Sequence, residues 1–311
     1  MKILILGAGA IGGYYGGRLV QAGADVTFMV RGERAESISK NGLRIKSAMG
    51  DFCGKVNTIP PNGATAAYDI VILTCKSYDL GSALQAIHSA VDNKTVIIPL
   101  LNGVEQLNKI SEIFPFAECW GGIAKISTTL LPDGSIYQFD NVNQIVLGMI
   151  DGRLNTRADE LISLFKKQAV DAALSNRILY DLWDKFTFIA TMAGITCLMR
   201  GSIDEILKVP SGKELIIQLL KECSTVSERE GFALEPHIFS IYLEHLVGPS
   251  FGLKSSMLRD IEKSHRTEVE HILGDMLNRA YKHDLSTPLL EIATAHVRTY
   301  EFQLSATAAS H

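Results

Sequence analysis

The positions of apolar residues divide the chain into two parts of different character. Short apolar runs at residues 2–6, 25–30, 69–75 and 95–100 have the length of buried strands, and helix-like or turn-like sequence separates them. This arrangement predicts a parallel sheet with crossover helices. Residues 119–149 then alternate between apolar and polar positions around a Pro-Asp-Gly turn, which predicts antiparallel strands that close the first domain.

The pattern after about residue 155 is helical to the end of the chain. Apolar residues recur there at helical spacing, and we find no further strand pattern. We therefore predict an α/β fold, with an N-terminal Rossmann-type doubly wound sheet at residues 1–175 and an all-α C-terminal domain at residues 176–311.

Composition and charge exclude several classes of partner. The net charge is -4, and no concentrated basic face of the kind that binds nucleic acid is visible in the sequence. The apolar run begins directly after Lys2, which leaves no room for a signal peptide, and no apolar run approaches the roughly 18 residues that cross a bilayer. The five cysteines are scattered and form no C-x-x-C pair. We expect a cytoplasmic protein that binds small molecules, has no metal site and does not bind membranes.

A glycine-rich turn follows the first strand and precedes a helix. It reads Gly7-Ala8-Gly9-Ala10-Ile11-Gly12, which fits the G-x-G-x-x-G pattern of dinucleotide-binding sites. The first glycine permits the tight turn, the second lets the backbone approach a pyrophosphate, and the third lets helix and strand pack closely. The N-terminus of the following helix then faces the phosphate charge. The pattern predicts a dinucleotide site, and an ordinary structural turn is the alternative.

The end of the second strand indicates which dinucleotide binds. An NAD or FAD site usually has an acidic residue there, to hydrogen-bond the ribose hydroxyls. This strand ends in Arg31, with Arg34 nearby, and an arginine pair can bind a 2′-phosphate. The sequence therefore favours NADPH. The alternative is a solvated arginine paired with Glu33. Lys76 and Asn102 follow two later strands, at the edge of the sheet where ligands bind.

The helix predicted after residue 176 carries one lysine in apolar surroundings. Asn176 is a candidate N-cap, and the helix is nearly free of charge after Lys185. Burial would favour the neutral amine and lower its pKa, so that Lys185 could act as a general acid toward a carbonyl oxygen that is being reduced. The alternatives are an ion pair with Asp181 or an extended side chain that reaches water.

Together these residues resemble a known family. The chain resembles the ketopantoate reductases (2-dehydropantoate 2-reductases), which reduce ketopantoate with NADPH on the route to pantothenate. Besides the glycine turn and Arg31, the resemblance includes these segments in order: Leu73-Thr74-Cys75-Lys76, Leu101-Asn102-Gly103-Val104-Glu105, Leu182-Trp183-Asp184-Lys185, Ser255-Ser256-Met257-Leu258-Arg259-Asp260 and Arg266-Thr267-Glu268-Val269-Glu270.

The resemblance implies a role for each of these side chains. Lys185 would be the proton donor, Asn102 would contact cofactor and substrate, and Lys76 would contact the cofactor. Ser255 and Ser256 would bind the substrate, and Glu268 would reach the cofactor side of the site. Each has a structural alternative: the asparagine could form a turn with Gly103, the serines could cap a helix, and Glu268 could pair with Arg266.

Two of these residues cannot lie on one straight helix if both face a small substrate. Ser256 and Glu268 would be about 18 Å apart at 1.5 Å per residue. We therefore expect a helix break near residues 264–266, with Ser264 or a neighbour capping a helix that continues to about Tyr281.

The sequence departs from the family where the substrate is expected. Family members have asparagines four and eight residues after the lysine and a third further on. This chain has Ile189, Ala193 and, in our register, Ile203. An unmatched polar group buried there would cost about 1 to 3 kcal/mol. We therefore expect the substrate to be ketopantoate or a less polar 2-oxo acid. Two rivals stay open, a different hydroxy-acid dehydrogenase and a non-catalytic NADPH sensor. The sequence also leaves a homodimer open, because helical second domains often associate through apolar faces.

Overall fold

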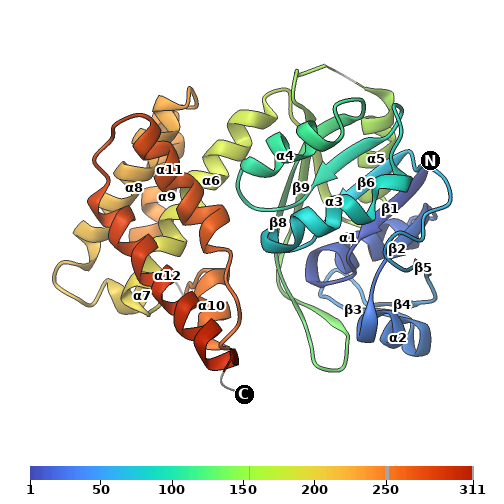
Figure 1. Ribbon diagram of the computed structural model, residues 1–311, viewed down its shortest axis with the longest axis horizontal. Coiled ribbons are helices and arrows are strands. Elements are labelled where there is room, and N and C mark those ends of the chain that lie inside the picture. Colours follow the sequence, from blue (N-terminus) through green and yellow to red (C-terminus); the bar gives the residue numbers. More distant parts are fainter. Residues whose placement is uncertain (154, 249–251, 310–311) are drawn as a thin grey trace. The chain divides into compact units, whose positions relative to one another are not determined.

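The chain folds into two compact units. The computed structural model describes residues 1–153, 155–248 and 252–309. The first unit consists of Met1–Leu101 and Gln106–Leu182, and the second consists of Asn102–Glu105 and Trp183–His311 (Figure 1). The functional boundary that we placed between residues 175 and 176 stays a prediction.

The first unit is built on a mixed sheet. Within the described residues, its strands are β1 (Lys2–Leu6), β2 (Asp25–Met29), β3 (Leu43–Lys46), β4 (Phe52–Gly54), β5 (Asn57–Ile59), β6 (Ile70–Leu73), β7 (Val96–Pro99), β8 (Glu118–Leu130), β9 (Ile136–Met149) and β10 (Asp171–Leu174). Their order is β4-β3-β9-β8-β7-β6-β1-β2-β5, with β10 beside β9. Among the strand pairs that the structure describes, β3–β4 and β8–β9 are antiparallel and the others are parallel. The four strands at the centre of the predicted parallel sheet, β7-β6-β1-β2, are parallel as expected.

Helices cover both faces of this sheet. Side chains alternate along β1, so that Ile3 and Ile5 enter one core and Leu4 and Leu6 enter the other. The first core includes residues of α1 (Ala10–Gln21) and α5 (Thr156–Lys166), and the second includes residues of α3 (Leu80–Ala86) and α4 (Glu105–Ile113). The remaining elements are α2 (Gly32–Asn41), η1 (Ser77–Asp79) and η2 (His88–Ala90). The predicted doubly wound fold is confirmed.

The antiparallel pair β8–β9 is also confirmed, and it joins at the predicted turn. Gly134 has a φ of +78°, and the Leu131 amide donates to the Ser135 carbonyl across the turn. Our expectation that no strand follows residue 155 was wrong, because β10 pairs in parallel with β9. This strand is four residues long and places only Ala172 fully in the core, so it has no strong strand pattern.

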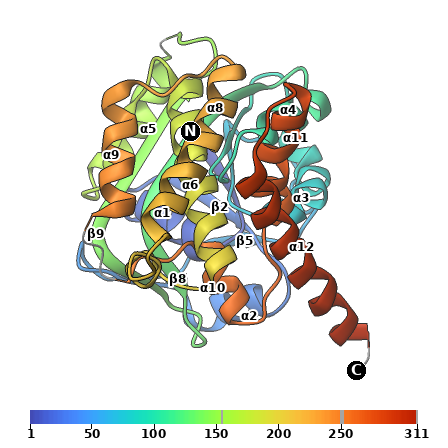
Figure 2. The same ribbon diagram turned by 90° about the vertical axis from the view of Figure 1, so that its left-hand side faces the viewer.

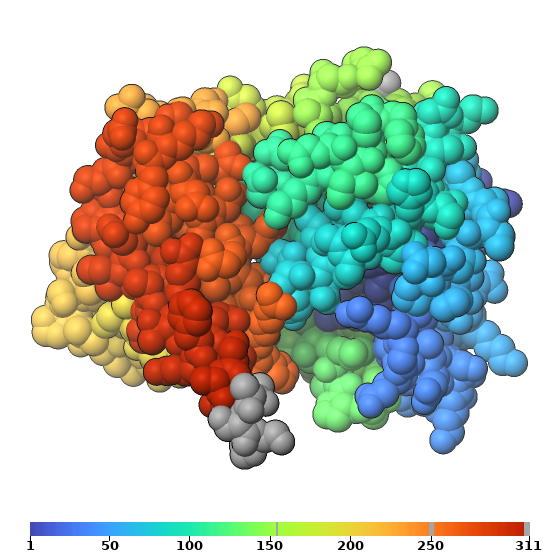
Figure 3. Space-filling view, viewed as in Figure 1, coloured from blue at the N-terminus to red at the C-terminus, as the bar shows by residue number. Residues whose placement is uncertain are grey.

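The second unit is helical throughout its described residues, as predicted. It contains α6 (Ile178–Met199) from Trp183 onward, α7 (Ile203–Ile206), α8 (Gly212–Arg229), α9 (Pro236–Val247), α10 (Ser256–Glu262), the π-helical η3 (Glu270–Gly274), α11 (Asp275–Lys282) and α12 (Pro288–Ala309). Helix α8 packs against α9, α11 and α12 (Figure 2). The part of this unit turned toward the viewer in Figure 3 is formed largely by its orange and red C-terminal helices.

Glycine and a buried glutamate fix the packing of this unit. A Cβ at Gly194 of α6 would lie 2.8 Å from the Leu219 Cδ2 atom of α8, so any larger residue there would displace the leucine side chain. Glu222 of α8 is buried and accepts the backbone N–H groups of Leu289 and Leu290, at 3.3 and 2.9 Å. Since the first amides of a helix lack partners inside it, Glu222 caps α12 from a neighbouring helix.

Candidate cofactor and catalytic residues

The glycine turn connects β1 to α1 and is packed against the end of β6. Gly7 has a φ of +96°, which favours glycine. A Cβ at Gly12 would lie 2.1 Å from Thr74 Oγ1 and 2.4 Å from the Gly7 carbonyl oxygen. The third glycine is therefore required for close packing, as the sequence motif predicts.

Gly9 has no such explanation inside the protein. It is the N-cap of α1, its φ of -74° suits any residue, and a Cβ there would meet no atom within 4 Å. The first turn of α1 carries no acidic residue, so its free amides would meet an anion without competition. Open space at a helix N-terminus fits the pyrophosphate of a dinucleotide, which must approach the backbone closely.

The side chains of Thr74 and Arg34 hold this turn in place. Thr74 Oγ1 donates to the Leu6 carbonyl oxygen at 2.9 Å. Arg34 donates from Nε to the Ala8 carbonyl oxygen and from Nη1 to the Gly134 carbonyl oxygen, both at 2.7 Å. Burial, and secondarily the charge of Arg44, lowers the pKa of Arg34. Arg34 therefore binds the loop backbone, whereas the sequence suggested a role at a 2′-phosphate.

Arg31 and Lys76 lie at the same edge of the sheet as the glycine turn. Strands β2, β1 and β6 are adjacent and parallel, so their carboxyl ends lie side by side. Arg31 is the N-cap residue of α2, and Lys76 immediately precedes η1. The Arg31 side chain is 72% exposed and its Nη2 lies 3.3 Å from Oδ2 of Asp79, so its partner is this aspartate and not the Glu33 that we considered. An exposed pair of this kind is weak and readily exchanged for another anion.

The remaining candidates lie in the second unit. Lys185 is half-buried on α6, and Asn102 is half-buried in the short segment Asn102–Glu105. Glu268 is half-buried just before the helix that begins at Val269, and its carbonyl oxygen accepts the amides of His271 and Ile272. The helix predicted after residue 176 is α6, which spans Ile178–Met199. We considered Asn176 as its N-cap, but the Ser175 hydroxyl is the group that accepts a backbone N–H near its start, from Arg177 at 3.0 Å.

The two serines differ in accessibility. Ser255 is 2% exposed; its Oγ accepts the Leu258 amide at 3.1 Å and lies 2.7 Å from Thr196 Oγ1. The helix-capping alternative for Ser255 is therefore confirmed, and most of the bonding capacity of its hydroxyl is used within the protein. Ser256 is the exposed first residue of α10, so it is the more accessible of the two.

The predicted break between Ser256 and Glu268 is confirmed. Helix α10 ends at Glu262, and Ser264 has a φ of +55°. We expected Ser264 or a neighbour to cap the next helix, and for Ser264 this was wrong. It belongs to the end of α10, where the Ser264 amide donates to the Ile261 carbonyl oxygen and the His265 amide to that of Asp260. The following helix begins at Val269 and includes the π-helical turn η3, a distortion that is frequent at functional sites.

The three positions where the family has asparagines are apolar and mostly inaccessible. Ile189 is half-buried, and Ala193 and Ile203 are 2% and 0% exposed. The buried hydroxyls of Thr187 and Thr191 on the same helix donate to carbonyl oxygens one turn back, at 3.0 and 2.9 Å. These threonines lie on the face of α6 opposite to Ile189 and Ala193, so they supply no polar group in place of the asparagines, and the face of Ile189 and Ala193 is apolar at both positions.

Within the described residues, no group of three or more His, Cys, Asp or Glu side chains is arranged to hold a metal ion. No helix in the same part of the chain combines the length and the apolar character needed to cross a membrane.

Comparison with known proteins identifies the family. The family model described as ketopantoate reductase PanE/ApbA matches residues 3–152, and the model of its C-terminal domain matches residues 177–301. An uncharacterised oxidoreductase of Bacillus subtilis, YkpB, is 34% identical over 97% of this chain and 99% of its own. A 2-dehydropantoate 2-reductase of Nostoc sp. is 26% identical over 92% of this chain and 91% of its own. The structure of 2-dehydropantoate 2-reductase from Methylococcus capsulatus superposes with a TM-score of 0.88 over 98% of both chains, at 24% identity. The resemblance expected from the sequence is confirmed, and this chain belongs to the ketopantoate reductase family of oxidoreductases.

Proposed function

We propose that this protein uses NADPH to reduce a small 2-oxo acid, ketopantoate or a less polar relative, to the 2-hydroxy acid. The observation that carries the proposal is Gly9, which lies in open space at the N-terminus of α1. No protein atom requires glycine there, whereas a pyrophosphate does. Membership of the ketopantoate reductase family supports the same reading.

The choice of NADPH over NADH rests on Arg31. The strand that would carry an acidic residue in an NAD site ends in this arginine, and its side chain is exposed and held only by Asp79. A guanidinium in that position can exchange the weak carboxylate pair for a bidentate contact with the 2′-phosphate. Lys76 follows β6, which is separated from β2 by β1 in the sheet, and it would add a second positive charge next to the cofactor.

The chemistry divides between the cofactor and the second unit. When bound, the nicotinamide supplies the hydride that the carbonyl carbon receives. Lys185 would donate a proton to the carbonyl oxygen, so that the ketone gains one hydride and one proton and becomes an alcohol. Asn102 would orient cofactor and substrate, Ser255 and Ser256 would bind the substrate, and Glu268 would lie on the cofactor side.

The substrate should be less polar than ketopantoate. Ile189, Ala193 and Ile203 cannot hydrogen-bond a hydroxyl, and each polar group left unmatched there would cost about 1 to 3 kcal/mol of binding. An apolar side chain on the 2-oxo acid would instead gain from contact with Ile189, the member of the three that is only half-buried.

A substrate panel tests the proposal. Purified protein is mixed with NADPH or NADH and with ketopantoate or 2-oxo acids that carry aliphatic or phenyl side chains, and cofactor oxidation is followed by absorbance. We expect oxidation of NADPH in preference to NADH, with higher kcat/KM for the apolar acids than for ketopantoate. Efficient turnover of ketopantoate alone would contradict the narrower substrate assignment. NADPH binding without turnover of any 2-oxo or hydroxy acid would favour the sensor and overturn the proposed function.

A further inference from the structure

The segment Asn102–Glu105 belongs to the helical unit although the residues on both sides of it belong to the sheet unit. Gly103 has a φ of +88°, and a Cβ there would lie 3.1 Å from Nε2 of His271 in η3. The segment therefore lies tightly against the helical unit. Asn102, the proposed contact to cofactor and substrate, is at its start, and Glu105 is at its end.

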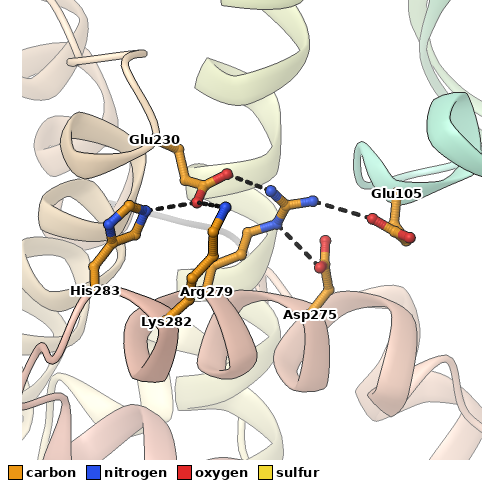
Figure 4. Close-up of polar contacts among 6 residues, drawn as sticks. All are labelled: Glu105, Glu230, Asp275, Arg279, Lys282 and His283. Carbon is orange, nitrogen blue, oxygen red and sulfur yellow. Dashed lines mark hydrogen bonds and ion pairs between the residues drawn. The ribbon is translucent and has the colours of Figure 1, made fainter.

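A single guanidinium binds the end of this segment. Arg279 of α11 has a different carboxylate on each of its three nitrogens (Figure 4). Nε donates to Asp275 at 3.0 Å, Nη2 donates to Glu105 at 3.2 Å, and Nη1 donates to Glu230. The arginine side chain is only 15% exposed, so water competes little for these contacts. A lysine ammonium could not reproduce three contacts from one planar group.

Arg279 also contacts the helix that carries the proposed proton donor. Its guanidinium carbon lies 5.0 Å from the centre of the Trp183 ring, within the range of a cation–π contact. Trp183 is 3% exposed and its other contacts include a stacked ring, Phe232, with centroids 5.3 Å apart. Trp183 precedes Lys185 by two residues, just as Glu105 follows Asn102 by three.

We infer that Arg279 is a positioning residue of this enzyme. Through Glu105 and Trp183, it holds the segment that carries Asn102 and the turn of α6 that carries Lys185 in one fixed arrangement. Arg279 does this without contacting the substrate. The inference rests on the proposed function for the roles of Asn102 and Lys185, but the anchoring of residues 102–105 can be measured independently of it.

Three variants separate anchoring from general stability. Arg279→Gln removes the guanidinium, and Glu105→Gln replaces its ion pair with Arg279 by at most a neutral hydrogen bond. Arg298→Gln is the matched control, because Arg298 forms a bidentate pair with Glu270 in the same unit, at 2.7 Å for both bonds. We expect amide hydrogen exchange of residues 102–105 to become faster in Arg279→Gln and Glu105→Gln, and to stay unchanged in Arg298→Gln. Unchanged exchange in Arg279→Gln, or equal acceleration in the control, would overturn the inference whether or not the enzyme is active.

Kinetics then test the consequence for the reaction. A small displacement of a positioned group can cost about a hundredfold in rate, so we expect Arg279→Gln to lower kcat between about tenfold and a hundredfold. In an Asn102→Ala background the same substitution should lower kcat less, because one of the two groups that it positions is gone and only Lys185 is left to be displaced, while its effect on the melting temperature should be the same in both backgrounds. If Arg279→Gln lowers kcat by the same factor in the wild-type and Asn102→Ala backgrounds, the inference would be overturned. Absence of turnover by the wild-type protein would instead count against the proposed function, and the exchange measurement would still decide the anchoring.

Discussion

The sheet unit and the helical unit present their candidate residues in opposite ways. In the sheet unit, the glycine turn, Arg31 and Lys76 follow three adjacent parallel strands, so the strand order alone places them at one edge. In the helical unit, Asn102, Lys185 and Glu268 come from segments far apart in sequence. There, side-chain contacts such as those of Arg279 fix the backbone. Strand order thus places the candidate residues of the sheet unit, whereas side-chain networks place those of the helical unit.

This difference predicts that substitutions in the two units affect different steps. Changes at the glycine turn and Arg31 of the sheet unit should alter cofactor binding, and removal of Lys185 from the helical unit should alter the chemical step. The comparison fails if both kinds of substitution change both quantities equally.

Removal of the lysine should have the largest effect. In Lys185→Ala no general acid protonates the carbonyl oxygen, so kcat should fall about 10² to 10⁴-fold. The dissociation constant for NADPH, measured by fluorescence, should change little, because the glycine turn and Arg31 lie in the other unit. Lys213→Ala, at an exposed position of α8, is the control and should leave both quantities unchanged. Equal losses of kcat and cofactor affinity in Lys185→Ala would show that the lysine is structural.

Two glycines of the turn should separate folding from cofactor binding. Gly12→Ala places a methyl group against Thr74 and the Gly7 carbonyl, so it should destabilise the protein by about 1 to 3 kcal/mol. Gly9→Ala meets no protein atom and has an ordinary φ, so the free energy of unfolding should fall by less than about 1 kcal/mol, the preference for glycine over alanine at an N-cap. It should nevertheless weaken NADPH binding by about tenfold, equivalent to about 1.4 kcal/mol, because the methyl group occupies the space of the pyrophosphate. Denaturant unfolding and cofactor titration measure the two effects. A stable Gly9→Ala protein with unchanged affinity for NADPH would place the phosphates elsewhere.

The same contrast explains how much could be predicted from the sequence. The glycine turn, its strand and its helix are contiguous, so the motif specifies both the local fold and its chemistry. The order of the central strands follows from general rules for parallel sheets. Strand β10 was missed because its residues, Asp171–Leu174, are few and include two alanines without a marked alternation. Its structure depends on pairing with β9 and not on its own sequence pattern.

Long-range side-chain contacts could not be predicted in this way. Glu105 and Arg279 are 174 positions apart, and no local spacing relates them. Ser255 was correctly placed at a helix start, but only the structure shows that its hydroxyl also bonds Thr196 of another helix. Likewise, Arg34 is near Arg31 in sequence, yet it binds the carbonyl of Ala8 and that of Gly134, 100 residues away.

The smallest expected effect concerns pH, and it should be confined to the network of the helical unit. Burial alone would raise the pKa of the Glu230 carboxyl, but the hydrogen bond with His283 and the charges of Arg279 and Lys282 hold it below its usual range. A lowered folded-state pKa means that the carboxylate stabilises the protein above the ordinary glutamate pKa of about 4.3, and that this contribution is lost as the pH falls through the lower folded value. Glu230→Gln should therefore cost about 1 kcal/mol at neutral pH, since its amide oxygen can still accept hydrogen bonds.

The difference in unfolding free energy between wild type and Glu230→Gln should shrink as the pH is lowered below the ordinary glutamate pKa of about 4.3 and the wild-type carboxyl becomes protonated. Asp275 titrates in the opposite sense, because its burial raises its pKa, but it is present in both proteins and its effect should largely cancel. Glu228→Gln, an exposed change on the same helix, controls for loss of one surface charge. A constant difference at every pH would mean that Glu230 titrates normally. The side-chain network around Arg279 and Glu230 would then position residues of the helical unit without adding electrostatic stability. In that respect it would no longer differ from the sheet edge.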